Sequence, residues 1–212
     1  MEQPQYITLA LVAFTALISW QAFSRSDMKG KLLFYPYEMK RSNDYFRFIT
    51  YGFVHSDLNH LLLNMLSLYL FGKGVEFYLV NFFGQQQGLL LYVFLYFSGL
   101  VLSTLPDYYR HQDNPGYTAL GASGAVSAIV FAYIFLRPWD IVFWFIPAVL
   151  YGILYLIYSA YMDRYGRDNI GHNTHFWGSL YGLMFIFSVL KLMRPGELSY
   201  IFQAYMHIPY FQ

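Results

Sequence analysis

The stretch Gly121-Ala122-Ser123-Gly124 opens an apolar segment of small residues that continues to Ala132. Glycines beside a serine leave room for a close approach, and the start of a helix presents unpaired backbone N–H groups that favour a developing negative charge. Ser123 is therefore a candidate nucleophile. The same pattern also fits ordinary helix packing in a membrane, because Gly124, Ala128 and Ala132 place a small side chain at every fourth position.

The composition indicates a membrane protein. The 212 residues are 57% hydrophobic, 22% aromatic and 12% charged, whereas soluble domains average about 25% charged residues. A formal net charge of +1 offers no basic surface, so we expect no nucleic-acid partner. The absence of cysteine excludes disulfides, thiolate catalysis and zinc bound by cysteine, and nothing in the composition implies a cofactor.

Six apolar segments predict an all-α fold, a polytopic membrane protein whose six transmembrane helices form one membrane-embedded domain over residues 1–212. The expected spans are about residues 6–23, 57–72, 89–105, 123–136, 141–161 and 172–192.

The segments outside these spans carry three further expectations. Residues 24–50 hold six of the thirteen Lys and Arg residues between aromatic side chains, so we expect an ordered loop in the membrane interface. Residues 1–5 lack the basic region of a signal peptide, and we expect the first span to be retained. The tail, residues 194–212, is expected to be an interfacial helix or a docking segment.

The fourth span is short for a membrane helix. Pro138 ends it after about 14 residues, or about 21 Å, while the hydrocarbon core is roughly 30 Å thick. Ser123 would then begin below the near membrane surface, where backbone outside a helix requires burial in protein or a wet cavity. We therefore expect water at Ser123.

Polar residues recur near the N-terminal ends of the second, fourth and sixth spans. His60 and Asn64 are four residues apart and project from one helix face. His175, Gly178 and Gly182 also share one face, and the glycines permit close contact with the small residues of the fourth span. Polar groups inside spans are costly and usually mark a site. Since these three spans cross in the same direction, we expect their polar groups on one side of the membrane.

These side chains can be given roles in peptide-bond hydrolysis. Ser123 would attack as the nucleophile and His175 would act as the general base. The Ser123 N–H, Asn64 and His60 would form the oxyanion site. Apart from Asp57 at the rim, we expect no acidic residue near this face, so the pair would be a Ser-His dyad in which another group orients the imidazole.

Three motifs occur together in a fixed order: His55-x4-His60-x3-Asn64, Gly121-Ala122-Ser123-Gly124, and His175-x2-Gly178-x3-Gly182. Together they resemble the rhomboid family of intramembrane serine proteases. The resemblance implies a six-helix bundle, and we expect neither a cofactor nor a metal. It further implies single-span membrane proteins as substrates, cleaved within the lipid bilayer near the outer ends of their helices.

The chain departs from the family pattern at two positions. Phe46-Arg47 stands where the family usually has a Trp-Arg pair. The family often places an aromatic residue four positions after the nucleophile, packed on the catalytic histidine, and here that position is Ser127. Another residue must therefore pack on His175, or the histidine is held differently. The resemblance also implies that the fifth span gates substrate entry.

Charge and resemblance favour opposite orientations. An N-inside topology places four of the thirteen Lys and Arg residues inside and the other nine outside, against the positive-inside rule. Six of those nine belong to the first loop, which we expect to be folded and hence a poor reporter of the rule. We therefore expect the N-terminus inside, the active site facing outward, and a bacterial inner (cell) membrane as the location.

Three other function classes remain open. A metalloprotease is disfavoured because the sequence has no His-Glu-x-x-His helix. A channel or transporter is disfavoured because the sequence shows no paired broken helices. A catalytically silent relative that binds membrane helices fits the fold, but it has no need of both Ser123 and His175. The metal ligands in the first alternative would be His55, His60, His172 and His175.

Overall fold

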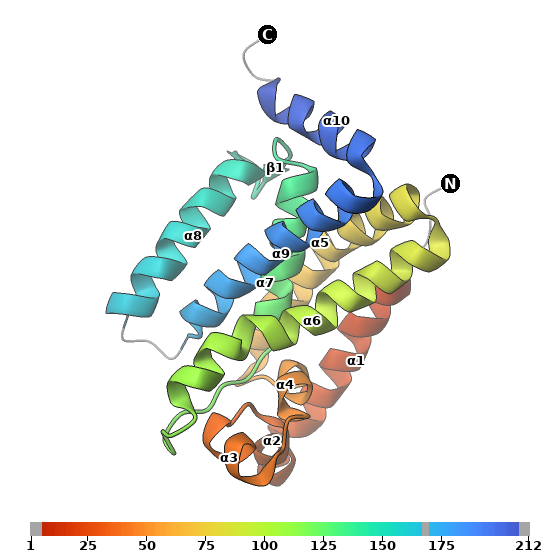
Figure 1. Cartoon of the computed structure of the whole chain (residues 1–212). Coiled ribbons are helices and arrows are strands. Elements are labelled where there is room, and N and C mark those ends of the chain that lie inside the picture. Colours follow the sequence, from red (N-terminus) through yellow and green to blue (C-terminus); the bar gives the residue numbers. More distant parts are fainter. Residues whose placement is uncertain (1–5, 167–169, 208–212) are drawn as a thin grey trace.

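Helices make up nearly all the regular structure of the computed structural model, which describes residues 6–166 and 170–207 (Figure 1). The long helices are α1 (Tyr6–Phe23), α5 (Leu58–Phe83), α6 (Gln85–His111), α7 (Ser123–Leu136), α8 (Ala148–Tyr165) and α9 (His172–Met193). The all-α fold class is confirmed. The expectations about a signal peptide and about the end of the tail concern residues 1–5 and 208–212, which lie outside the described residues.

Consecutive long helices run in opposite directions. In Figure 1, α1 begins at the upper right and descends, and α5, α7 and α9 all begin at the lower end of the molecule. We call this lower end the site end and the opposite end the far end. The candidate side chains on α5, α7 and α9 lie in the first two turns of their helices, and they are therefore gathered at the site end.

The chain is an integral membrane protein. Among the described residues, three helices, α1, α6 and α9, are long and apolar enough to cross a membrane, and α7 is a shorter apolar helix. With 14 residues, α7 is about 21 Å long. It lies at the centre of the bundle, where nearly all of its residues are buried. Its short length and central place leave its first residue, Ser123, surrounded by other helices.

The contact between α7 and α9 depends on glycine, as the sequence predicts. A Cβ added at Gly178 would lie 3.2 Å from Gly124 Cα, and one at Gly182 would lie 2.7 Å from Ala128 Cα. Only a residue without a side chain allows backbones to approach this closely. The match between Gly178, Gly182 and the small-residue face of α7 sets the distance between the helices that carry Ser123 and His175.

Two helices are longer than their sequence predicts. α5 continues to Phe83 although Gly72 suggests an end, because Gly72 is a packing position where a Cβ would lie 2.5 Å from the Tyr92 hydroxyl. α6 continues through Pro106 to His111, although an interior proline removes one N–H donor and crowds the carbonyl group four residues before it. The sequence predicts a water-facing loop from Pro106 to Thr118, and this is wrong for residues 106–111, which are helical. Asp107 consequently lies on the helix.

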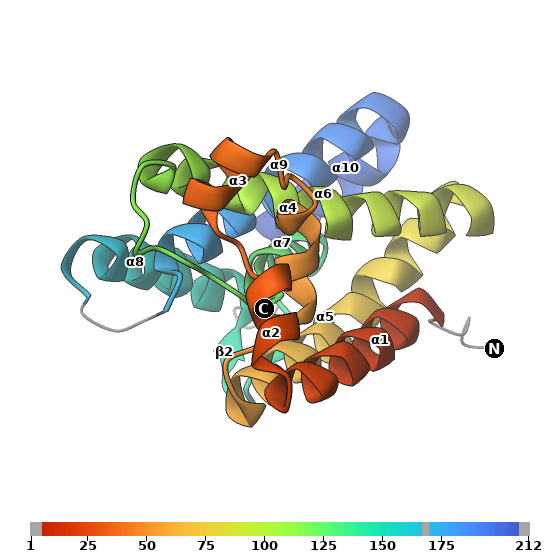
Figure 2. The same cartoon turned by 90° about the horizontal axis from the view of Figure 1, so that it is seen from below.

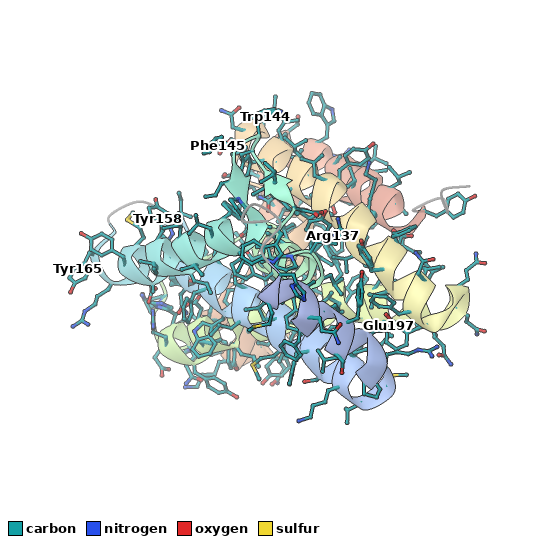
Figure 3. All side chains as sticks on the ribbon, turned by 90° about the horizontal axis from the view of Figure 1, so that it is seen from above. Arg137, Trp144, Phe145, Tyr158, Tyr165 and Glu197 are labelled. Atoms are coloured by element: carbon teal, nitrogen blue, oxygen red, sulfur yellow. The ribbon has the colours of Figure 1, made fainter. Side chains whose placement is uncertain are left out.

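The fifth predicted span begins later than expected. Residues Ile141–Val142 (β1) and Ile146–Pro147 (β2) pair as a short antiparallel hairpin, and α8 starts only at Ala148. The chain reverses through Phe143 and Trp144, whose φ angles of 51° and 68° lie in the left-handed region. Trp144 and Phe145 project from the hairpin in Figure 3. Pro147 then leads into the helix, because its own N–H is absent and its φ is compatible with a helix start.

The first loop is ordered, as expected. It contains the short helices α2 (Ser26–Leu32), α3 (Pro36–Ser42) and α4 (Arg47–Thr50) and a 3-10 turn, η1 (Tyr51–Phe53). Figure 2 shows α2, α3 and α4 on the lower face of the molecule. Buried Arg47 donates to the carbonyl oxygens of Gly30 and Leu33, each at 3.0 Å. This family-typical arginine therefore fixes the loop, although Phe46 beside it is exposed.

The tail forms α10 (Pro195–Met206) at the far end (Figure 1). It buries Leu198 and Ile201 against the bundle, and the Trp139 indole N–H donates to the Ala204 carbonyl oxygen at 2.7 Å. The tail is thus a helix attached to the far end, away from Ser123.

Candidate active site

One cavity at the site end collects the residues predicted from the sequence. It has a volume of 1190 Å³, and His60, Asn64, Ser123 and His175 all line it. The walls come from α5, α6, α7, α8, α9 and the loop before Ser123. Residues from three separate predicted spans therefore face one space.

Ser123 is the first residue of α7. The first helical hydrogen bond runs from the Val126 N–H to the Ala122 carbonyl oxygen at 2.9 Å. The N–H groups of Ser123, Gly124 and Ala125 consequently have no acceptor within the helix. They provide partial positive charge beside the Ser123 hydroxyl, which suits an oxyanion.

The backbone before Ser123 is held by the first loop. Phe34 and Ala119 exchange two backbone hydrogen bonds of 2.9 Å, and the Gly121 N–H donates to the Tyr51 carbonyl oxygen at 2.9 Å. Gly121 has a φ of 111°, and a Cβ there would lie 2.6 Å from His60 Cε1. Glycine is required at this position for both reasons. The ring of His60 therefore lies directly against the turn that leads into Ser123.

The hydrogen bonds of His60 define its neutral form. The Ser56 hydroxyl donates its single hydrogen to Asp57 at 2.7 Å, so it accepts from His60 Nδ1 at 3.0 Å. In the neutral imidazole Nε2 then carries a lone pair, and it donates to an oxyanion only as imidazolium. Asn64 donates one amide hydrogen to the His60 carbonyl oxygen at 2.9 Å, which leaves a second N–H for the cavity. Asn64 is thus the better oxyanion donor.

His55, the first histidine of its motif, does not line the cavity. Its Nε2 accepts from the Ala122 N–H at 3.3 Å, and its Nδ1 donates to the Ser19 hydroxyl at 2.8 Å. That direction follows because the Ser19 hydroxyl itself donates to the Phe53 carbonyl oxygen. Burial, followed by the neighbouring His60, lowers the pKa of His55 to about 3. A permanently neutral His55 thus fixes the backbone before Ser123.

His175 packs against Tyr155 of α8, a residue that sequence reasoning missed. The two rings stack at 28° with their centroids 6.3 Å apart. The Tyr155 hydroxyl is hydrogen-bonded to Ser127 at 3.1 Å, and Ser127 occupies the position where an aromatic residue is expected. The ring therefore comes from α8 instead of α7. The missing aromatic at Ser127 was the signal, but it does not say which residue takes its place.

A second missed residue is Asp107 on α6. It lines the same cavity, although its side chain is 2% exposed, and it accepts hydrogen bonds from Asn173 at 2.6 Å and Thr174 at 2.8 Å. The expectation that only Asp57 would supply a carboxylate near this face is wrong. The error follows from ending the third span before Pro106.

Comparison with known proteins agrees with the motifs. The family model of the Rhomboid domain matches residues 42–192. The chain is 28% identical over 201 residues to Rhomboid protease GlpG of Haemophilus influenzae, covering 92% of this chain and 96% of that protein. It is 30% identical over 190 residues to the mitochondrial RHOMBOID-like protein 12 of Arabidopsis thaliana, covering 82% of this chain and 55% of the relative.

A third relative is Rhomboid-related protein 1 of Caenorhabditis elegans, which is 28% identical over 170 residues, or 76% of this chain and 44% of that protein. The chain thus spans about half the length of the two eukaryotic relatives and nearly all of the bacterial one. The family match covers well over half of the 212 residues. The chain therefore belongs to the rhomboid family.

Proposed function

We propose that the protein is an intramembrane serine endopeptidase that hydrolyses peptide bonds in or near the transmembrane segments of single-span membrane proteins. One observation carries this proposal: Ser123, His175 and Asn64 face the same cavity from the starts of three different helices. The family match and the protease among the relatives support it.

The reaction proceeds in two steps. Ser123 Oγ attacks the peptide carbonyl carbon while His175 accepts the hydroxyl proton, and His175 then donates this proton to the leaving amine. Water next attacks the acyl-enzyme, again with His175 as base, and releases the carboxylic acid and Ser123. The oxyanion of each tetrahedral intermediate is stabilised by the Ser123 N–H and Asn64, and by His60 when it is charged.

The proposed topology has six crossings, formed by α1, α5, α6, α7, α8 and α9 within a single domain over residues 1–212. The N-terminus lies inside and the site end faces outward. We propose the inner membrane of a bacterium, because the relative that this chain covers almost end to end is bacterial. Reporters fused to the C-terminus test this orientation, and a C-terminal reporter that is active outside the cell contradicts it.

Purified, reconstituted protein provides the test of activity. We expect cleavage of a single-span test substrate by the wild type and none by Ser123→Ala or His175→Ala, with Asn64→Ala slowed on the order of 10². Ser98→Ala is the matched control, because it removes a serine hydroxyl from a different helix, α6. Cleavage by Ser123→Ala at the wild-type rate contradicts the assignment of the nucleophile. Substrate binding without cleavage by the wild type favours the catalytically silent alternative.

A further inference from the structure

The first turn of α9 carries His175, and within the described residues its N-cap position supplies no side-chain cap. The N-cap residue is Gly171, which offers no side-chain hydrogen bond to the turn. The first backbone hydrogen bond runs from the His175 N–H to the Gly171 carbonyl oxygen at 3.0 Å. Helix ends without caps fray readily. A fixed position for His175 therefore requires contacts from outside α9.

Asp107 on α6 supplies such contacts. Its Oδ1 accepts from the Asn173 amide at 2.6 Å and its Oδ2 accepts from the Thr174 hydroxyl at 2.8 Å. Hydrogen bonds to an ionised acceptor are stronger than neutral ones, and a carboxylate this deeply buried is costly without them. The two oxygens thus bind two successive residues that come immediately before His175.

Thr174 extends this connection to the helix of the nucleophile. A Cβ added at Gly124 would lie 2.8 Å from Thr174 Cγ2, so the Thr174 methyl group packs directly on the residue after Ser123. Thr174 is thus held by this packing on one side and by its hydrogen bond to Asp107 on the other. The hydrogen bond to Asp107 therefore sets how the starts of α7 and α9 face each other.

We propose that Asp107 is a positioning residue for His175. It fixes the first turn of α9 through Asn173 and Thr174, and its charge stabilises the imidazolium that forms when His175 takes the Ser123 proton. This inference rests on the proposed function, in which His175 is the general base. It also supplies the group that the sequence requires to orient the imidazole.

Other ionisable groups face the same cavity and bear on its charge. Arg110 and Asp163 pair with each other at 3.3 Å, so their fields largely cancel. Burial, followed by the charge of Asp107, raises the pKa of the Tyr117 phenol. The remaining ionisable lining groups are Tyr51 of η1, Asp57 and His60 of the α5 entry, His111 of α6, Tyr151 and Tyr155 of α8, and His172 of α9.

The test compares Asp107→Asn with Glu76→Gln in the reconstituted full chain. Glu76 is the matched control, because it is also a buried carboxylate that binds the start of another helix, but at the far end. Thr174→Val removes one donor to Asp107 at nearly constant volume, and Thr174→Ser retains that donor. Thermal unfolding confirms that each variant is folded at the assay temperature.

We expect Asp107→Asn to lower kcat by roughly tenfold to a hundredfold, with KM changed by less than about threefold. The acid limb of its pH–kcat profile should move to lower pH by about half a unit or more, since a negative charge that favours imidazolium is lost. Glu76→Gln should leave this limb in place. Thr174→Val should lower kcat, and Thr174→Ser should restore most of it.

An NMR titration of the His175 ring separates this inference from the proposed function. It uses protein with isotope-labelled histidine in a Ser123→Ala background, with and without Asp107→Asn, and it requires no cleavage. A lower titration midpoint on removal of the Asp107 charge supports the inference even if no substrate is cut. An unchanged midpoint, or an equal shift in Glu76→Gln, overturns it even if the protease activity is established.

Discussion

Two buried carboxylates occupy opposite ends of this molecule and make similar contacts. At the far end, Glu76 of α5 accepts hydrogen bonds from the backbone N–H groups of Ile7 and Thr8, at 3.1 and 2.8 Å, and from the Thr8 hydroxyl at 2.6 Å. At the site end, Asp107 of α6 accepts from the side chains of Asn173 and Thr174. Each carboxylate satisfies donors at the start of another helix and complements its dipole.

The difference lies in what each contact holds. Glu76 binds the backbone of α1 in a fully buried contact, where the Thr8 and Tyr92 hydroxyls are also hydrogen-bonded at 2.8 Å. Asp107 binds side chains beside His175 and lines a cavity. Under the proposed function, the same physical device stabilises the fold at one end and aligns the general base at the other. Changes at the far end should affect stability, and changes at the site end should affect turnover.

The largest contrast is expected between two glycines with positive φ. Gly121→Ala at the site end would place a Cβ 2.6 Å from His60 in a left-handed conformation, and we expect at least a hundredfold loss of kcat/KM, since small displacements of reacting groups are costly. Gly84→Ala at the far end has a φ of 79° but open space around it. It should cost about 1–3 kcal/mol of stability with kcat/KM retained, as measured by thermal unfolding and cleavage. Equal loss of activity in both variants contradicts the division between the two ends.

Tyr155 should have the next largest effect. Tyr155→Leu removes the ring that stacks on His175, and we expect kcat to fall about tenfold because the imidazole gains rotational freedom. Tyr155→Phe loses only the hydrogen bond to Ser127 and should retain most activity. The far-end control is Tyr92→Phe, which removes a buried hydrogen bond to Thr8 and should cost about 1 kcal/mol of stability. The stacking role is wrong if Tyr155→Leu cleaves as fast as the wild type.

His55 predicts how stability depends on pH. Its pKa is lowered from 6.5 to about 3 in the folded state, so between these values the unfolded state binds a proton that the folded state does not. The contribution of neutral His55 to the free energy of unfolding is therefore fully present above pH 6.5. It is lost as the pH falls toward 3, by at most about 1.4 kcal/mol per pH unit. Thermal unfolding from pH 7 to 4 measures this slope. His55→Asn should be less stable at pH 7 but show a shallower slope, and an unchanged slope refutes the explanation.

The smallest effect is expected from the ion pair between Arg110 and Asp163. It joins α6 to α8 at the rim of the cavity at 3.3 Å, and half of the Arg110 side chain is exposed. Exposed pairs contribute about 0–1 kcal/mol, so Arg110→Gln should change kcat/KM by less than about twofold. Rates measured at low and high salt check this, because the effect should vanish at high salt. If Arg110→Gln lowers kcat/KM as much as Asp107→Asn does, the charge that matters for turnover lies in the ion pair at the rim and not on the buried Asp107.

The sequence by itself determined the features that depend on local composition and spacing. The bounds of α1, α7 and α9 agree with prediction to within a residue, because an apolar run and a stopping residue define a helix locally. The glycine face formed by Gly178 and Gly182 was also predictable, since helical periodicity fixes which residues share a face. The common location of His60, Ser123 and His175 followed from the order and direction of the spans.

The tertiary structure alone decided which distant residues meet. Gly72 and Pro106 resemble helix ends locally, but α5 and α6 continue through them, and Gly72 packs closely against Tyr92 of α6. Asp107 meets Asn173 across 66 residues of sequence, and Tyr155 reaches His175 from a different helix than the family pattern suggests. No local periodicity encodes such pairs, because they depend on how the helices are placed relative to one another.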